Sequence, residues 1–138
     1  MKYLLDTNIV SELMKDKPNE CVIKKLAGIP SLSLYLSVLT WGELRKGVEK
    51  LAASSKKDQL RLWLEKDLPG WFGNRLLSIN SDVADRWGRL LADINRPVPA
   101  VDSLIAATAL YYDAVIVTRN IKDFNYYQDL VVLNPFEP

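Results

Sequence analysis

The feature of the sequence that most constrains the fold is the segment Ala114–Val117, four apolar residues in a row after a long alanine-rich stretch. A strand with one face in water alternates apolar and polar residues, and this segment shows no alternation. Uninterrupted apolar strands are typical of parallel sheets, because helices cover both faces of such sheets. The chain is therefore expected to contain a parallel sheet buried between helices.

The rest of the chain alternates between strand-like and helix-like patterns. Further strands are expected at Lys2–Leu5, Leu34–Val38 and Leu130–Leu133. Apolar residues at helical spacing predict helices at 9–14, Glu20–Ala27, Thr40–Ala52, about 60 to Pro69-Gly70, Ser81–Asn95 and Ser103–Tyr112. This order predicts an α/β fold with a central, mostly parallel sheet and helices on both faces. With 138 residues and no linker-like stretch, residues 1–138 are expected to form a single domain.

The absence of histidine excludes several kinds of active site. With no histidine and one cysteine, Cys21, the chain cannot build a Ser-His-Asp triad, a histidine-ligated zinc site or a thiolate zinc cluster. Carboxylates are the remaining source of ligands for a hard metal ion. The net charge of +1 gives no general attraction to nucleic acid, so binding of that kind requires local basic patches.

The sequence gives no sign of a membrane or secreted protein. No apolar run approaches the ~20 residues that a membrane-spanning helix needs. The first apolar stretch stops at Asp6, too early for a signal peptide. A lone cysteine supports no internal disulfide framework. We therefore expect a cytoplasmic protein without membrane contact.

Four acidic residues lie where α/β proteins bind ligands, beyond the carboxyl ends of the strands. Asp6 ends the first strand, and Glu43 lies in the first turn of the helix after the second strand. Asp102 opens the alanine-rich helix, and Asp123 follows the strand Ala114–Val117. Mg²⁺ and Mn²⁺ prefer oxygen ligands, and carboxylates that converge repel one another unless a cation neutralises them. The four positions are candidates for a metal site.

Each acidic residue also has a purely structural interpretation. Asp6 and Asp102 stand where an N-cap aspartate belongs, accepting amide hydrogens at the positive end of a helix. Thr40 and Glu43 match the spacing of a capping box, and Asp123 could shape a turn with its own backbone. Spacing alone does not decide between capping and metal binding, because convergence depends on the fold.

The four acidic segments, taken together, resemble those of one known family. Tyr3–Leu13, Ser37–Gly47, Val101–Leu110 and Val117–Phe124 are similar, in order and spacing, to the four acidic motifs of the PIN-domain nucleases. The closing segment Leu133–Phe136 is also similar. Within that family, the chain resembles the VapC-type toxins of bacterial and archaeal toxin–antitoxin pairs. One departure is the pair Tyr112-Asp113, where family members often carry His-Gly.

The resemblance implies a PIN-like three-layer fold and a metal-dependent endoribonuclease that hydrolyses RNA phosphodiesters with Mg²⁺ or Mn²⁺. Whether one or two metal ions operate stays open. The implied metal-binding and catalytic residues are Asp6, Glu43, Asp102 and Asp123. The positions implied to support them by hydrogen bonding are Thr7, Asn8, Thr118 and Asn120.

The resemblance also implies partners. We expect a homodimer and a cognate VapB-type antitoxin that covers the active groove and places a basic side chain in the acidic pocket. Basic residues beside the motifs could hold RNA phosphates, although solvated surface charge explains them equally well. These candidates are Arg45, Lys46, Lys50, Arg119 and Lys122.

Three alternative functions are disfavoured by particular residues. A signalling receiver domain needs an acidic pair after the first strand, and Thr7 follows Asp6. A haloacid-dehalogenase-type phosphatase needs a second aspartate two residues on, and Asn8 stands there. A catalytically weak PIN-like module that binds RNA or a partner is disfavoured by the complete set of four acidic residues. The sequence does not indicate which RNA is cut.

Overall fold

The computed structural model describes residues 1–138 and has a sheet of five parallel strands at its centre. The strand order is β3-β2-β1-β4-β5. The strands are β1 (Lys2–Leu5), β2 (Leu34–Ser37), β3 (Leu76–Leu77), β4 (Ala114–Val117) and β5 (Val132–Leu133). In the middle of the sheet Leu5 is paired with Val117, so the segments that follow β1 and β4 emerge side by side. The expected parallel sheet is confirmed.

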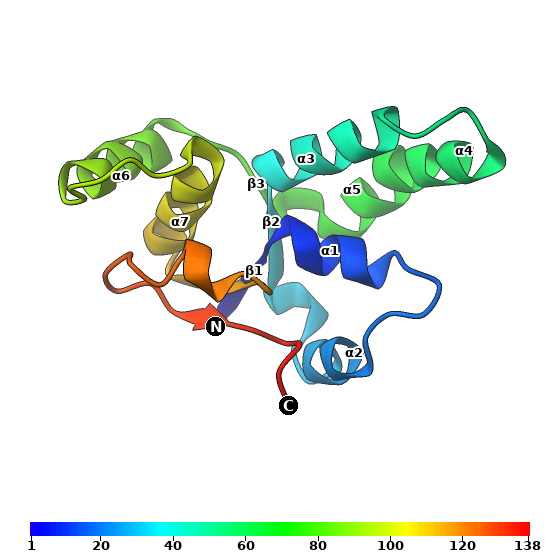
Figure 1. The fold of residues 1–138 in the computed structure, drawn as a ribbon, viewed down its shortest axis with the longest axis horizontal. Coiled ribbons are helices and arrows are strands. Elements are labelled where there is room, and N and C mark those ends of the chain that lie inside the picture. Colours follow the sequence, from blue (N-terminus) through cyan, green and yellow to red (C-terminus); the bar gives the residue numbers. More distant parts are fainter.

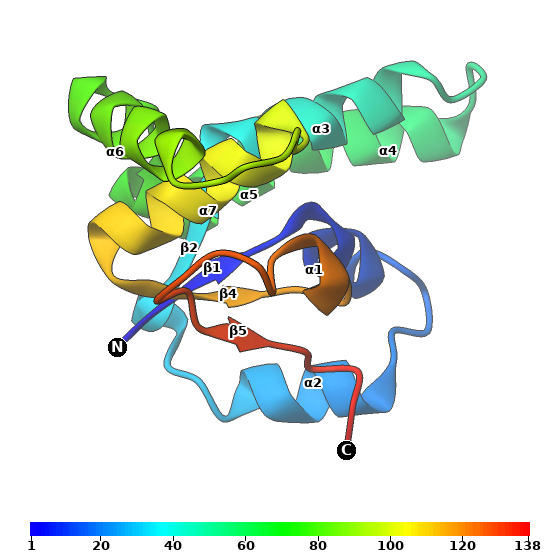
Figure 2. The same cartoon turned by 60° about the vertical axis from the view of Figure 1, so that its left-hand side comes forward.

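Helices cover both faces of the sheet, as Figures 1 and 2 show. They are α1 (Thr7–Leu13), α2 (Glu20–Ala27), α3 (Val38–Glu49), α4 (Ser55–Leu62), α5 (Leu68–Phe72), α6 (Ser81–Ala92) and α7 (Ala100–Tyr112). Helices α6 and α7 pack against each other on one side of the molecule, and α3, α4 and α5 lie on the other (Figure 1). The expected three-layer α/β arrangement is confirmed.

Two apolar clusters form the core, one on each face of the sheet. Neighbouring strand residues point to opposite faces, so Leu4 joins the cluster beneath α6 and α7 while Leu5 joins the cluster beneath α1 to α5. Ile116 and Val117 of β4 divide in the same way. This explains why β4 is apolar at every position.

The helical region around residues 55–72 differs from the expectation. A helix was expected to end near Pro69-Gly70, but helical structure continues to Phe72. A wider π-helical turn at Trp63–Asp67 separates α4 from α5 and places Pro69 in the first turn of α5. Proline is tolerated there because the first amides of a helix have no partner within it.

Three smaller expectations about the elements were wrong. The two-residue strand β3 was not expected, because two residues are too few to show a pattern. The helical spacing of Ala84, Trp87 and Leu91 predicts that Ala84 faces the core, but Ala84 is exposed and the buried residues of α6 are Val83 and Leu90. The spacing of Leu44, Val48 and Leu51 predicts that Leu51 faces inward, but Leu51 lies beyond the end of α3 and is 40% exposed. No helix is both long and apolar enough to pass through a lipid bilayer.

Candidate active site

Asp6 is held at the junction of β1 and α1 by four hydrogen bonds. Its backbone amide continues the pairing of β1 with β4 by donating to the Val117 carbonyl at 2.9 Å. The Asp6 side chain caps α1 by accepting from the Thr7 amide at 2.8 Å. Its other oxygen accepts from the Thr118 hydroxyl at 2.8 Å and from the Asn8 side-chain amide at 3.1 Å. The carboxylate is therefore buried and fixed in direction, and the expected N-cap role is present.

Thr118 and Asn8 join the ends of β1 and β4 around Asp6. Thr118 is fully buried, and its hydroxyl oxygen accepts from the Asn8 side chain at 3.2 Å and from the Asn120 amide at 3.0 Å. The Asn8 side-chain oxygen accepts from the Arg119 amide at 3.0 Å. Each polar group in this network has a partner, as a buried polar cluster requires. The positions suggested by the motifs thus form one connected network.

Glu43 reaches the same region from α3. Thr7 donates its hydroxyl hydrogen to the Glu43 carboxylate at 2.5 Å, which links α1 to α3 across the top of the sheet. The capping-box interpretation of Glu43 is wrong, because α3 begins at Val38 and Ser37 is its cap, accepting from the Leu39 amide. Glu43 lies in the second turn of α3, so its carboxylate is free to face Thr7.

Asp102 is the half-buried member of the acidic set. Helix α7 begins at Ala100 with Pro99 at its cap position, so the capping interpretation of Asp102 is wrong. Burial, the largest cause, and repulsion from the neighbouring carboxylates of Asp123, Asp6 and Glu43 together raise the pKa of Asp102 to about 6. Since the pKa of Asp102 responds to all three neighbours, the four carboxylates act on one another through space.

The pKa of Asp6 is also raised, chiefly by burial, even though its hydrogen bonds from Thr118 and Thr7 favour the ionised form. Repulsion from Glu43 adds to the effect of burial. Asp123 is exposed and closes a short 3₁₀ turn, Ile121–Asp123, after β4. All four carboxylates line one cavity of about 450 Å³. The fold therefore brings together acidic residues from four separate segments.

The sequence analysis missed the α1 side of this cavity. Ser11, Glu12 and Lys15 line it together with Phe136. Glu12 is buried, accepts from Lys15 at 2.9 Å and from the Asn19 amide at 2.9 Å, and these bonds lower its pKa. Asn8, Ser11 and Lys15 recur at a spacing of three to four residues, a polar stripe that could have indicated this face.

The donor set fits a hydrated divalent ion better than an all-protein cage. No three acidic, cysteine or histidine side chains are close enough together to hold one ion. Mg²⁺, however, commonly uses one or two carboxylates and completes its shell with water and substrate oxygens. Burial first, and repulsion from neighbouring carboxylates second, raise the pKa values of Asp6 and Asp102, and a bound cation would favour their ionised forms. The residues present therefore fit a weakly enclosed Mg²⁺ or Mn²⁺ site.

The candidate RNA-binding residues separate into two groups. The first group is Arg45, whose guanidinium forms ion pairs with other residues. It binds the Glu65 carboxylate at 2.7 Å and the Glu49 carboxylate at 3.5 Å, and it lies over the Trp41 ring. Arg119 lines the acidic cavity itself. The remaining three candidates line hollows that adjoin it: Lys46, Lys50 and Lys122.

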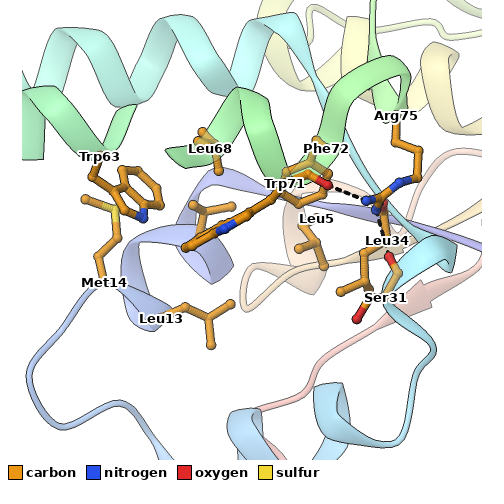
Figure 3. A pocket seen from close by; sticks show the side chains of 11 residues that line it. Leu5, Leu13, Met14, Ser31, Leu34, Trp63, Leu68, Trp71, Phe72 and Arg75 are labelled. Carbon is orange, nitrogen blue, oxygen red and sulfur yellow. Dashed lines mark hydrogen bonds between the residues drawn. The ribbon is translucent and has the colours of Figure 1, made fainter. Parts of the chain in front are cut away.

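A second cavity of about 410 Å³ is apolar and lies on the other side of α1 (Figure 3). Trp63, Leu68, Trp71 and Phe72 form one wall of it, facing Leu13 on α1. No acidic residue lines this cavity. Trp71 is 60% exposed and Leu13 is 41% exposed, so the cavity has an open apolar rim.

Arg75 closes one end of the apolar cavity. Its guanidinium donates to the Ser31 carbonyl at 2.7 Å and the Leu34 carbonyl at 2.6 Å, and also to the Trp71 carbonyl. These bonds hold the loop before β2 against the end of α5. These polar contacts close one end of a cavity whose walls are apolar.

Comparison with known proteins gives the family. A family model described as PIN domain matches residues 3–129. Toxin FitB of Neisseria gonorrhoeae is 34% identical over 96% of this chain and 97% of its own length. VapC ribonuclease Y4jK of Sinorhizobium fredii is 30% identical over 98% of both.

Solved structures agree with these relatives. The structure of FitAcB from Neisseria gonorrhoeae matches with a TM-score of 0.89 and 33% identity, covering 99% of both chains. A toxin–antitoxin complex from Klebsiella pneumoniae matches with a TM-score of 0.68 and 25% identity, covering 99% of this chain and 100% of that one. Sequence and fold agree over nearly the whole length, and the chain belongs to the PIN-domain family, among its VapC-type members.

Proposed function

We propose that this chain is a metal-dependent endoribonuclease that acts as the toxin of a VapBC-type pair in the cytoplasm. The observation that carries the proposal is the convergence of Asp6, Glu43, Asp102 and Asp123 on one cavity from four separate segments. The pKa of Asp102 is raised by burial and then by repulsion from the other three carboxylates, and this repulsion supports a role in binding a cation. Similar proteins carry the names toxin and ribonuclease.

The proposed role of each residue follows from its position in the cavity. Asp6 and Asp102, the two more buried carboxylates, would be the main ligands of Mg²⁺ or Mn²⁺, and a second, more weakly held ion would lie near Glu43 or Asp123. A bound ion would activate a water molecule and neutralise charge on the phosphate. Thr118, Asn8 and Thr7 keep Asp6 and Glu43 oriented through the hydrogen bonds described above.

Hydrolysis adds the water oxygen to phosphorus and breaks one phosphorus–oxygen bond of the RNA backbone. The departing oxygen takes a proton and becomes a free hydroxyl at the new RNA end. The exposed carboxylates of Glu43 and Asp123 lie within the cavity and are the groups of this chain available to move that proton. Because β1 lies between β2 and β4, Glu43 on the helix after β2 and Asp123 on the loop after β4 lie on either side of Asp6.

A cleavage assay that compares a variant of the buried Asp6 with a variant of the exposed Asp16 tests the proposal. Asp6→Asn is expected to lower the rate of RNA cleavage about 1000-fold or more, because a metal ion supplies several kcal/mol of transition-state stabilisation. Asp16→Asn removes the same charge from a side chain that is 97% exposed and should leave the rate unchanged. EDTA should silence the wild type, and Mg²⁺ or Mn²⁺ should restore it. A folded Asp6→Asn protein with the wild-type rate would refute the assignment.

A second candidate function is a PIN-like module that binds RNA with little catalysis. The observation in its favour is that no three ligating side chains form a ready-made metal group. Such a module would bind RNA in Mn²⁺ but leave it intact, and Asp6→Asn would not change the outcome. The same assay therefore separates the two functions.

The proposed partners are a second copy of this chain and a VapB-type antitoxin. An antitoxin that places a basic side chain among the four carboxylates would block the site by neutralising it. The open apolar cavity beside α1 offers a place for apolar side chains of the same partner. Trp71→Ala should weaken inhibition by the antitoxin without slowing cleavage, because Trp71 lies outside the acidic cavity. A chain that stays monomeric at high concentration would remove the homodimer from the proposal.

A further inference from the structure

Two grooves extend the acidic cavity in different directions. One, of about 630 Å³, runs along α3 and shares Thr7 and Glu43 with the cavity. The other, of about 430 Å³, lies at the loop after β4 and shares Arg119 and Asp123 with it. Each groove has residues in common with the cavity and therefore borders it, and together the three hollows define a path from α3 to the loop after β4.

Cations line the outer parts of this path. Lys46 and Lys50 lie in the α3 groove, are exposed and form no ion pair. Arg45, on the same helix, is instead held by Glu49 and Glu65, away from the groove. The two lysines are therefore the α3 cations that are available to a ligand.

Glycines keep the α3 groove open. Gly42 and Gly47 line it, and a Cβ atom built at either position would meet nothing within 4 Å. A ligand backbone can thus approach α3 closely between Glu43 and the two lysines. Elsewhere on the same helix, Leu44 and Val48 face the core, so the open side is the polar one.

The groove at the other end has its own fixed cation. The Arg119 guanidinium lies 4.5 Å from the centre of the Phe136 ring, and the Arg119 amide is bound to Asn8 beside Asp6. Lys122 is exposed and lines the same groove. Lys46 and Lys50 thus line the α3 end of the path, and Arg119 and Lys122 line the other end beside the carboxylates of Asp123 and Glu137.

We propose that a single strand of RNA lies along this path, with one phosphate in the acidic cavity and its neighbours on Lys46 and Lys50 at one end and Arg119 and Lys122 at the other. The proposal rests on the proposed function and identifies which cations bind the substrate. The phosphate beside the carboxylates would need a metal ion to neutralise the repulsion. The flanking phosphates would be neutralised by lysine or arginine side chains. The hollows are grooves joined end to end, which suit an extended strand better than the broad surface of a duplex.

The test compares two double variants that remove the same charge. Lys46→Ala/Lys50→Ala removes the α3 cations, and Lys24→Ala/Lys66→Ala removes two exposed lysines that line none of the three hollows. Both are made in the active chain for kinetics and in the Asp6→Asn chain for binding. The probe is a labelled single-stranded RNA of mixed sequence, titrated at several salt concentrations, with the duplex of the same RNA as a second arm.

Loss of two phosphate contacts should reduce the slope of log K against log salt by about 1.4 for single-stranded RNA. KM for cleavage should rise with kcat unchanged, because these contacts hold the substrate in the ground state and the transition state alike. Lys46→Arg/Lys50→Arg should restore the slope, and the Lys24/Lys66 control should match the wild type. The pair Arg119→Ala/Lys122→Ala should lower the slope in the same way.

Three results would overturn the proposal. The first is a slope in Lys46→Ala/Lys50→Ala equal to that of the control while cleavage persists, which would leave the proposed function standing. The second is equal or tighter binding of the duplex. The third is a change of oligomeric state in Lys46→Ala/Lys50→Ala without a change in the salt dependence of RNA binding. That result would make the α3 groove a contact between copies of the chain. Failure of the wild type to bind or cleave any RNA would overturn the proposed function together with the path.

Discussion

The acidic cavity and the apolar cavity share a stretch of backbone but are built from opposite physical chemistry. Leu5 and Asp6 are consecutive residues, yet Leu5 lines the apolar cavity and Asp6 the acidic one. The apolar cavity is shaped by side-chain packing of α5 against α1 and β2. The acidic cavity is shaped by hydrogen bonds that hold like charges near one another. The first should contribute stability, and the second should cost stability until a cation binds.

The largest expected effect on stability is on the apolar side. Leu68 is 2% exposed and lines the apolar cavity, so Leu68→Ala should lower the free energy of unfolding by about 2–5 kcal/mol. The cleavage rate per folded molecule should not change, because no carboxylate contacts this wall. Leu62→Ala, at a position that is 49% exposed, is the control. If chemical denaturation showed equal losses of unfolding free energy in Leu68→Ala and Leu62→Ala, the apolar cavity would not contribute the stability assigned to it.

A smaller loss is expected from the hydrogen-bond network under Asp6. Thr118→Val keeps the shape but removes the hydroxyl that serves Asp6, Asn8 and Asn120, at a cost of about 1–3 kcal/mol. It should also slow cleavage, since Asp6 loses a bond that orients it. Thr108, equally buried, donates only to a carbonyl of its own helix, so Thr108→Val should leave the cleavage rate unchanged. Unchanged cleavage in Thr118→Val would remove its positioning role.

The smallest effect is on the pH dependence of stability in EDTA. Because the pKa of Asp102 is about 6 in the folded chain and 3.8 is its ordinary value, the folded chain holds this proton more tightly than the unfolded chain between those pH values. The free energy of unfolding should therefore fall as pH rises from about 4 to about 6. Solvent screening reduces the loss due to Asp102 to about 1–2 kcal/mol.

Asp102→Asn should remove that part of the pH dependence, and chemical denaturation at a series of pH values measures it. The lowered pKa of Glu12 acts in the opposite sense, since its contribution to stability is lost as pH falls. The difference between wild type and Asp102→Asn isolates Asp102, because Glu12 is present in both. A difference that does not change with pH would contradict a raised pKa at Asp102.

The sequence was informative where a pattern extends over several residues. The strands Lys2–Leu5 and Ala114–Val117 have the bounds expected from their apolar runs, because burial on both faces permits no polar residue in the middle. The strand β3 could not be found, since two residues carry no periodicity. The helix through Pro69 could not be foreseen either, because the π-helical turn that accommodates it has no sequence signature.

At the site, the acidic residues were visible as polar positions just beyond buried strands. Spacing suggested a capping box at Thr40 and Glu43, yet the helix starts two residues earlier and Ser37 supplies the cap. The engagement of Arg45 by Glu65 also lay outside any local pattern, because 20 residues separate the two in the chain. Which cations are free for a ligand depends on tertiary contacts, which the structure supplies.

The most direct test of the account is a calorimetric titration of Mn²⁺ into the wild type, Asp6→Asn, Asp102→Asn and the exposed control Asp16→Asn. If Asp6 and Asp102 share one cation site, the wild type and Asp16→Asn will bind Mn²⁺ saturably, and both other variants will lose that binding while remaining folded. Undiminished Mn²⁺ binding by Asp6→Asn and Asp102→Asn would contradict a shared site.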